Sequence, residues 1–236
     1  ALGRAAEAAG AVIHERSEVT HITPGEKVTL HTPSGQVTAD HVIIGANGYL
    51  PPGICPQVDA RVMPINSFIA ATEPLPDRWQ EVLARDIAVA DDKFVVNYYR
   101  FSEDRRFLFG GRESYSIGFP TEMKGALAQR MTTLFPQLKG VRIDYAWGGT
   151  LGIPMNRLPH FARYGSGNVV SMSGFSGQGV ALGTLSGQIA AEAIAGQAER
   201  FDIMSQIPTP KFPGGPLLRH PLLILAMLWF SMRDKL

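Results

Sequence analysis

The sequence predicts an α+β fold, in which a part with mixed strands and helices is joined to a part built on an antiparallel sheet. Three observations support this prediction. The first forty residues alternate apolar and polar residues around turns at Pro24-Gly25 and Pro33-Ser34-Gly35, as hairpins do. Residues 61–112 contain several more strand-like segments. Residues 168–195 read as a strand, a glycine turn and a helix of small residues.

The composition is that of a folded globular protein, because 45% of the 236 residues are hydrophobic and only 18% are charged. This length holds one large domain or two small ones. The net charge of +1 and the lack of basic clusters interleaved with aromatic residues argue against nucleic acid as a partner. The single cysteine, Cys55, excludes an internal disulfide and fits a reducing, cytoplasmic compartment.

The first fifty residues predict a helix end followed by short strands. Residues 1–10 are typical of the last turns of a helix that stops at Gly10. The apolar run His41–Gly45 indicates a strand buried on both faces, and such a strand needs neighbours of which the chain offers few. Further strands are expected over residues 11–15, 18–22, 27–32 and 36–39.

A proline- and glycine-rich stretch, residues 51–56, marks a crossing between domains. Beyond it we expect strands over 61–72, 87–90, 94–101, 107–112 and 142–149, and helices over 77–84 and 122–134. The return to a strand, turn and helix near the end predicts a discontinuous first domain. The expected division is 1–58 with 141–200, then 59–140, then a tail over 201–236.

The tail contains an uninterrupted apolar run, residues 222–230. This run is far shorter than the roughly 20 residues that a membrane-spanning helix needs, so we expect no transmembrane span. We interpret the run as a helix docked on the surface of the protein or of a partner. Peripheral membrane contact is the alternative interpretation.

The glycine turn at residues 173–180 is the most informative segment. Backbone N–H groups at the start of a helix have no partner inside it and carry a partial positive charge. Three glycines let another molecule approach the backbone without a Cβ in the way. The turn therefore predicts a site for negative or carbonyl-bearing ligand groups, although an ordinary tight turn fits the same residues.

Five segments in order carry a resemblance to a known family: GAVIHERSEVTHI, ADHVIIGANGYL, NYYRFSEDRRFLFGG, WGGTLGIPMNRLP and SMSGFSGQGVALGTLSGQIAAEAI. The chain resembles the later part of FAD-dependent oxidoreductases of the D-amino-acid-oxidase-like family, especially the gamma-glutamylputrescine oxidoreductases. The resemblance implies an incomplete α/β FAD-binding domain and an antiparallel β-sheet substrate domain with helices. The strand–GxGxxG–helix unit that opens such proteins is missing, so a missing N-terminal half or a partner chain would hold the FAD pyrophosphate.

The resemblance also implies cofactor-contacting positions. It places Val19 near the adenine side of FAD and Arg157 near the cofactor. The turn Ala46, Asn47 and Gly48 would lie near the ribose and phosphates, although a plain strand-ending turn is the alternative. The loop over the flavin pyrimidine edge would consist of Gly174, Phe175, Ser176, Gly177, Gln178, Gly179 and Val180.

On the substrate side, the resemblance implies a role for Tyr98, with Tyr99 facing the other side of the sheet. Arg100 could pair with a carboxylate, because guanidinium binds carboxylates bidentately. A structural tyrosine and a solvated arginine are the alternatives. Relatives that oxidise amino acids carry an arginine four residues after the tryptophan at position 147, where this chain has Leu151. This difference favours a polyamine-like or N-alkylated amine as substrate.

The implied reaction moves hydride from the carbon beside an amine nitrogen to the flavin, and the imine product hydrolyses. It needs orientation of a neutral amine and no protein nucleophile or metal. Cys55 matches no position of covalent flavin attachment, so non-covalent FAD is expected. We expect this part of the enzyme to be inactive alone. The alternatives are a non-catalytic interaction module, or a subunit that needs a second chain to bind the FAD pyrophosphate.

Overall fold

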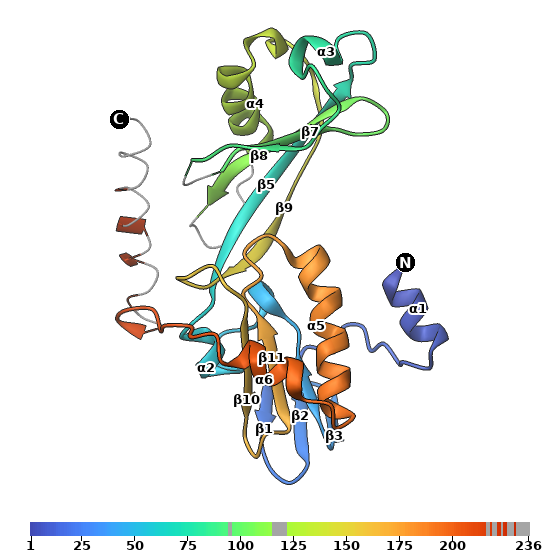
Figure 1. The fold of residues 1–236 in the computed structure, drawn as a ribbon, viewed down its shortest axis with the longest axis vertical. Coiled ribbons are helices and arrows are strands. Elements are labelled where there is room, and N and C mark those ends of the chain that lie inside the picture. The colour runs from blue at the N-terminus through green and yellow to red at the C-terminus, as the bar shows by residue number, and fades with distance from the viewer. Residues whose placement is uncertain are drawn as a thin grey trace.

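The computed structural model describes residues 1–93, 96–114 and 122–215, together with 218, 221, 222, 224, 225 and 229. Its helices and its mixed and antiparallel sheets form two lobes, which confirms the α+β fold (Figure 1). The two long strands β5 (Met63–Pro74) and β9 (Ile143–Ile153) run from the upper lobe down to the lower one. Their lower ends therefore bring the two lobes together.

The upper lobe is a five-stranded antiparallel sheet of order β6-β7-β8-β5-β9. Its other strands are β6 (Val89–Ala90), β7 (Tyr98–Phe101) and β8 (Arg106–Ser114). β9 pairs with β5 from Ile153 opposite Met63 to Ile143 opposite Thr72. The sheet thus includes a strand that the expected boundary at residue 140 assigns to the other domain, and the division into domains stays a prediction.

One face of this sheet is covered by helix α4 (Met123–Leu134), and it holds an aromatic core (Figure 1). Successive strand residues point to opposite faces, so Phe68 of β5 packs inward while its neighbours Ser67 and Ile69 face the other way. The short helices α3 (Trp79–Val82) and η2 (Pro136–Leu138) complete this side. The core consists of Phe68, Ala70, Leu75, Phe101, Phe107, Phe109, Leu127, Met131 and Leu138.

The lower lobe contains the strand–turn–helix unit. Strand β11 (Val169–Ser173) is buried along its whole length, between an antiparallel β10 (His160–Tyr164) and a parallel β4 (Val42–Ile44). Helix α5 (Gly179–Ile194) follows and packs on this sheet through Ile189, Ala190 and Ala193. Helix α6 (Glu199–Ser205) adds the buried Phe201 to the same core.

The hairpin prediction for the first forty residues is confirmed by β1 (His21–Thr23), β2 (Val28–Thr32) and β3 (Gly35–Ala39), which pair antiparallel in that order. Helix α1 (Leu2–Ala8) ends just before Gly10, whose φ is +94°. The short helices η1 (Asn47–Tyr49) and α2 (Pro56–Asp59) connect β4 to β5.

Three expectations about strands were wrong in detail. Residues 11–15 form no strand, and β1 begins at His21 rather than at 18. Strand β4 is the outer strand of its sheet and Ile43 is 45% exposed, so β4 is buried on one face only. Part of the strand expected over 94–101 lies outside the described residues, as does most of the C-terminal apolar run. None of the helices within the described ranges has the length and apolar character that crossing a membrane requires.

Candidate functional site

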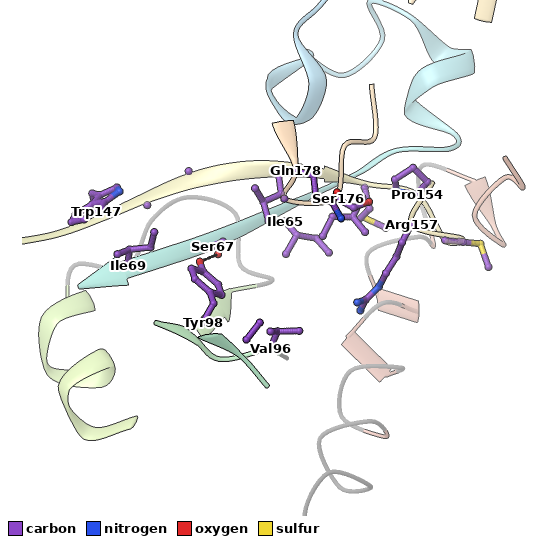
Figure 2. A pocket seen from close by; sticks show the side chains of 18 of the residues that line it. Ile65, Ser67, Ile69, Val96, Tyr98, Trp147, Pro154, Arg157, Ser176 and Gln178 are labelled. Atoms are coloured by element: carbon purple, nitrogen blue, oxygen red, sulfur yellow. Dashed lines mark hydrogen bonds between the residues drawn. The ribbon is translucent and has the colours of Figure 1, made fainter. Parts of the chain in front are cut away.

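A cavity of about 710 Å³ lies where the open face of the five-stranded sheet meets the turn before α5 (Figure 2). This is within the size range of small-molecule and cofactor sites. The sheet contributes alternate residues of β5 and β9, and the loops contribute both ends. The lining residues are Met63, Ile65, Ser67, Ile69, Ala90, Val96, Tyr98, Trp147, Gly148, Gly149, Leu151, Ile153, Pro154, Met155, Arg157, Ser176, Gly177, Gln178 and Phe212.

The cavity is elongated along β9. Trp147 and Ile153 both line it, and the six residue-to-residue steps between them span roughly 20 Å. Figure 2 shows Trp147 at one end and Arg157 at the other, with the turn residues Ser176 and Gln178 between them. A planar ring system and an extended substrate therefore have room to lie side by side along this strand.

Tyr98 supplies a hydroxyl group to the middle of the cavity. Its Oη lies 2.9 Å from Oγ of Ser67 on β5, at hydrogen-bonding distance (Figure 2). The ring lies over Gly110 in β8, where a Cβ would be only 2.1 Å from the ring atom Cε2. Tyr99 packs on the opposite face against Phe107 and Phe135, as predicted from strand alternation. The strand pairing thus places two hydroxyl groups together in an otherwise apolar wall.

The turn before α5 presents its backbone to the cavity through Gly177, which is exposed and has φ of +93°. A Cβ at Gly177 would meet only Cδ1 of Leu151 at 4.0 Å, so the backbone there is open to close approach. The turn was expected to have backbone amides without hydrogen-bond partners. Two of them have partners, because the amide of Ser176 donates to the carbonyl of Gly152 and the amide of Gln178 donates to the carbonyl of Phe175. The open donors are the first N–H groups of α5, from Gly179 onward, which have no partner inside the helix.

Asn47 joins the two lobes beside the cavity. Its Oδ1 accepts a hydrogen bond of 2.9 Å from the amide of Gly174 at the end of β11. The same atom would lie 2.3 Å from a Cβ at Gly152 in β9, so a side chain is excluded there. Gly48 lies against the backbone of Leu151 in the same way. Asn47 and Gly48 line a separate hollow of about 230 Å³ rather than the main cavity.

The structure therefore brings together only part of the predicted site. Tyr98, Arg157, Ser176, Gly177 and Gln178 line one cavity. The other predicted residues are absent from its lining: Val19, Ala46, Asn47, Gly48, Arg100, Gly174, Phe175, Gly179 and Val180.

The reasons for these absences differ. The Phe175 side chain is buried in the core with Met172, and Val180 points outward with 95% exposure. The guanidinium of Arg100 is directed to its own strand, where Nε donates to the carbonyl of Phe101. Val19 is half-buried on the segment before β1. Any ligand contact from Phe175 would have to come from its backbone.

The electrostatic character of the cavity is simple. Among its lining residues, all within the described part of the chain, Arg157 carries the only formal charge. Within the described ranges, no cluster of His, Cys, Asp or Glu side chains has the arrangement of a metal site. The pKa of His160 is lowered to about 4 by burial and by the nearby Arg61, but this residue lines a different crevice, near residues 205–210. The described lining thus offers no carboxylate to a cationic ligand.

Comparisons with known proteins identify the family. The family model described as "FAD dependent oxidoreductase" matches residues 1–193. The chain belongs to this family. It is 39% identical to "Probable oxidoreductase OrdL" of Rhizobium meliloti over 99% of the chain and 54% of that protein. It is 36% identical to "Gamma-glutamylputrescine oxidoreductase" of Escherichia coli over 96% of the chain and 53% of that protein. The chain spans about half the length of these curated relatives.

Solved structures share the fold. Glycine oxidase from Bacillus cereus superposes with a TM-score of 0.70 at 20% identity, covering 88% of this chain and 56% of the other. L-Proline dehydrogenase from P. horikoshii gives 0.64 at 21% identity, covering 80% of this chain and 52% of the other. At these identities the similarity establishes the fold alone.

The residues present fit the flavin end of FAD. The open backbone at Gly177, just before α5, is suited to a carbonyl-bearing ring edge. The adjoining apolar floor, which includes Ile65 and Leu151, suits the face of a planar ring. Sequence reasoning missed Ser67 and Phe212. The alternation Ile65, Ser67, Ile69 places Ser67 on one face of a strand, but no sequence signal points to Phe212.

Proposed function

We propose that this chain forms the substrate wall and the flavin-edge loop of an oxidoreductase that binds FAD non-covalently and oxidises a C–N bond of an amine. The substrate class is gamma-glutamylputrescine-like or otherwise N-substituted. The E. coli relative supports this class through its name. Leu151 supports it too, because an apolar side chain lines the cavity at the position where the family resemblance implies an arginine in amino-acid-oxidising members.

The observation that carries the proposal is one cavity wall that unites Gly177 of the turn with the Tyr98–Ser67 hydroxyl pair of the sheet. Bound FAD would supply a hydride acceptor. The backbone at 177–179 would hold the ring edge, and the hydroxyl pair would orient the amine nitrogen against it. The described lining has no carboxylate, so the amine would bind in its neutral form, which is the form able to lose hydride.

The state of Cys55 supports the proposal of non-covalent binding. Its thiol is buried in the lower-lobe core with Val58 and Val62, away from the cavity lining. Burial raises the pKa of this thiol, so the thiolate needed for attachment to a ring is disfavoured. The same single cysteine is consistent with a cytoplasmic location.

The proposal is tested on the full-length protein that contains this chain. We expect it to purify with a flavin absorption band that moves to the supernatant after acid precipitation. Under anaerobic conditions, gamma-glutamylputrescine and N-alkylated amines should bleach the band, and glycine should not. A protein that lacks the band and cannot be reconstituted with FAD would contradict the proposal, and a band bleached only by α-amino acids would contradict the substrate class.

The chain's length relative to its relatives supports a further part of the proposal, that residues outside these 236 bind the FAD pyrophosphate. These residues belong either to the same polypeptide or to a second chain. An intact-mass measurement of the flavin-containing species separates the two, because a second chain would appear as its own mass.

A further inference from the structure

A segment after α6, residues 207–212, reaches the cavity at its last residue, Phe212, and is here called the strap. Three hydrogen bonds attach it to the body: Nε of Arg61 donates to the carbonyl of Thr209 (3.2 Å), Nδ2 of Asn156 donates to the carbonyl of Pro208 (2.7 Å), and the amide of Phe212 donates to the carbonyl of Ala60 (2.8 Å). Prolines at 208 and 210 restrict its backbone further. The strap is therefore a held element that ends at Phe212, which lines the cavity.

Asn156 fixes two cavity residues at once. While its Nδ2 holds the strap, its Oδ1 accepts a hydrogen bond of 3.1 Å from the amide of Leu158. These bonds close a turn around Arg157, which has φ of +58° and lines the same end of the cavity. The side chain of Asn156 thus connects the turn that presents Arg157 with the strap that presents Phe212.

Phe212 stands at the end of the cavity opposite Trp147. Its amide donates to the carbonyl of Ala60, just before β5 begins at Met63, and Met63 pairs with Ile153, the last residue of β9. Phe212 also lies beyond residue 193, where the match to the family model stops. The end wall therefore includes one residue from outside the segment that the family model matches, beside Arg157 from within it, and differences in specificity between members are expected at such a residue.

We infer that Phe212 sets the length of the amine that the cavity accepts, with Asn156 and Arg61 as positioning residues that hold the strap. This inference rests on the proposed function. Each methylene group of the substrate that gains or loses apolar contact at this wall changes binding by about fourfold. Removal of the phenyl ring should extend the accepted length by several methylene groups.

The test uses the flavin-loaded protein that contains this chain and a series of N-alkylated amines of increasing chain length. Phe212→Ala should raise kcat/KM for the longest members by about tenfold or more and leave the shortest within twofold. Phe212→Trp should do the reverse. Lys211→Ala is the matched control, because Lys211 is an exposed strap residue outside the cavity lining and should leave the profile unchanged.

A binding measurement makes the test independent of turnover. Amines in which no carbon bonded to the nitrogen carries a hydrogen cannot lose hydride, and their Kd from calorimetry should show the same dependence on length. Asn156→Asp keeps the acceptor for Leu158 and loses the donor to Pro208, so it should broaden the length profile through KM with little change in kcat.

The outcomes separate this inference from the proposed function. If the unmodified protein oxidises no amine of the series, the proposed function fails. If it oxidises them with a length profile that Phe212→Ala and Phe212→Trp leave unchanged in folded, flavin-loaded protein, the inference about Phe212 is overturned and the proposed function stands. A profile that shifts in opposite directions in the two variants supports both.

Discussion

Replacement of Gly110 by alanine tests whether the position of the Tyr98 ring controls the reaction. A Cβ at Gly110 would lie 2.1 Å from Cε2 and 2.2 Å from Cζ of that ring, whereas ordinary contact begins at 3.4 Å. The ring therefore has to move by more than about 1 Å, which also breaks its hydrogen bond to Ser67. A displacement of this size at a substrate-orienting group lowers the rate by about 100-fold.

The stability cost should be smaller than the catalytic cost. Gly110 is buried but has no positive φ, so alanine can adopt its backbone conformation. Because the ring has the cavity to move into, we expect a loss of about 1–3 kcal/mol in the free energy of unfolding, which is the usual cost of overpacking. The variant should therefore fold and bind flavin while its kcat/KM falls.

The assay compares kcat/KM for an oxidised amine with the free energy of unfolding in urea. Gly35→Ala is the control, because a Cβ at this β3 glycine meets nothing within 4 Å and should change kcat/KM by less than twofold. Tyr98→Phe removes only the hydroxyl group and should lower kcat/KM by about fivefold, which corresponds to the loss of one hydrogen bond. A Gly110→Ala protein that keeps its flavin and stays within threefold of the unmodified kcat/KM would falsify the assignment of Tyr98 to substrate orientation.

Three further predictions concern His160, Ser67 and Asn47. Because the folded-state pKa of His160 is depressed to about 4, its contribution to stability is full above about pH 6.5 and is lost as the pH falls toward 4. In urea, the free energy of unfolding of the unmodified protein minus that of His160→Gln should fall by about 2 kcal/mol between pH 7 and pH 5. A difference that does not change with pH would refute the lowered pKa of His160. Ser67→Ala should lower kcat by about fivefold without loss of flavin, because Tyr98 keeps its ring but loses its partner; an unchanged kcat would count against the pair. Asn47→Ala should lower the free energy of unfolding, measured in urea, by about 2–4 kcal/mol, because the buried amide of Gly174 loses its acceptor and alanine is strained at φ +49°. Asn47→Asp keeps an acceptor oxygen and should lower it by less than about 1 kcal/mol.

Local patterns in the sequence were enough to predict much of the fold. Alternation placed Tyr98 and Tyr99 on opposite faces, and the turns at residues 24–25 and 33–35 predicted the first hairpin correctly. These signals concern neighbouring residues, so they do not depend on which strand lies alongside. The strand expected at residues 11–15 failed for the complementary reason, since a short apolar stretch with no neighbouring strand gains no ladder of hydrogen bonds.

The cavity itself could not be predicted from local patterns, because it depends on register between distant strands. Ser67 meets Tyr98 because Gly110 of the intervening strand β8 pairs with both Tyr98 and Ile69, and Ser67 lies two residues from Ile69 on the same face; beyond Gly110 the register shifts, and Phe68 pairs with Arg112. A shift of one residue reverses every side chain beyond it. The sequence shows a glycine pair there but not the partner that opposes it.

For Asn47, the family resemblance implies a contact with the cofactor, whereas the structure shows a structural hydrogen bond. The resemblance puts it near the ribose and phosphates of a cofactor, whereas the structure shows its Oδ1 bound to the amide of Gly174 and pressed against Gly152. Gly174 precedes the turn before α5, and Gly152 lies near the lower end of β9, a strand that lines the cavity. Asn47 therefore contacts both the segment before this turn and strand β9, which the amide of Ser176 also joins to the turn through the carbonyl of Gly152. A site formed by two lobes needs contacts of this kind. The turn before α5 and strand β9 can each be well folded and still lie too far apart to hold a ring between them.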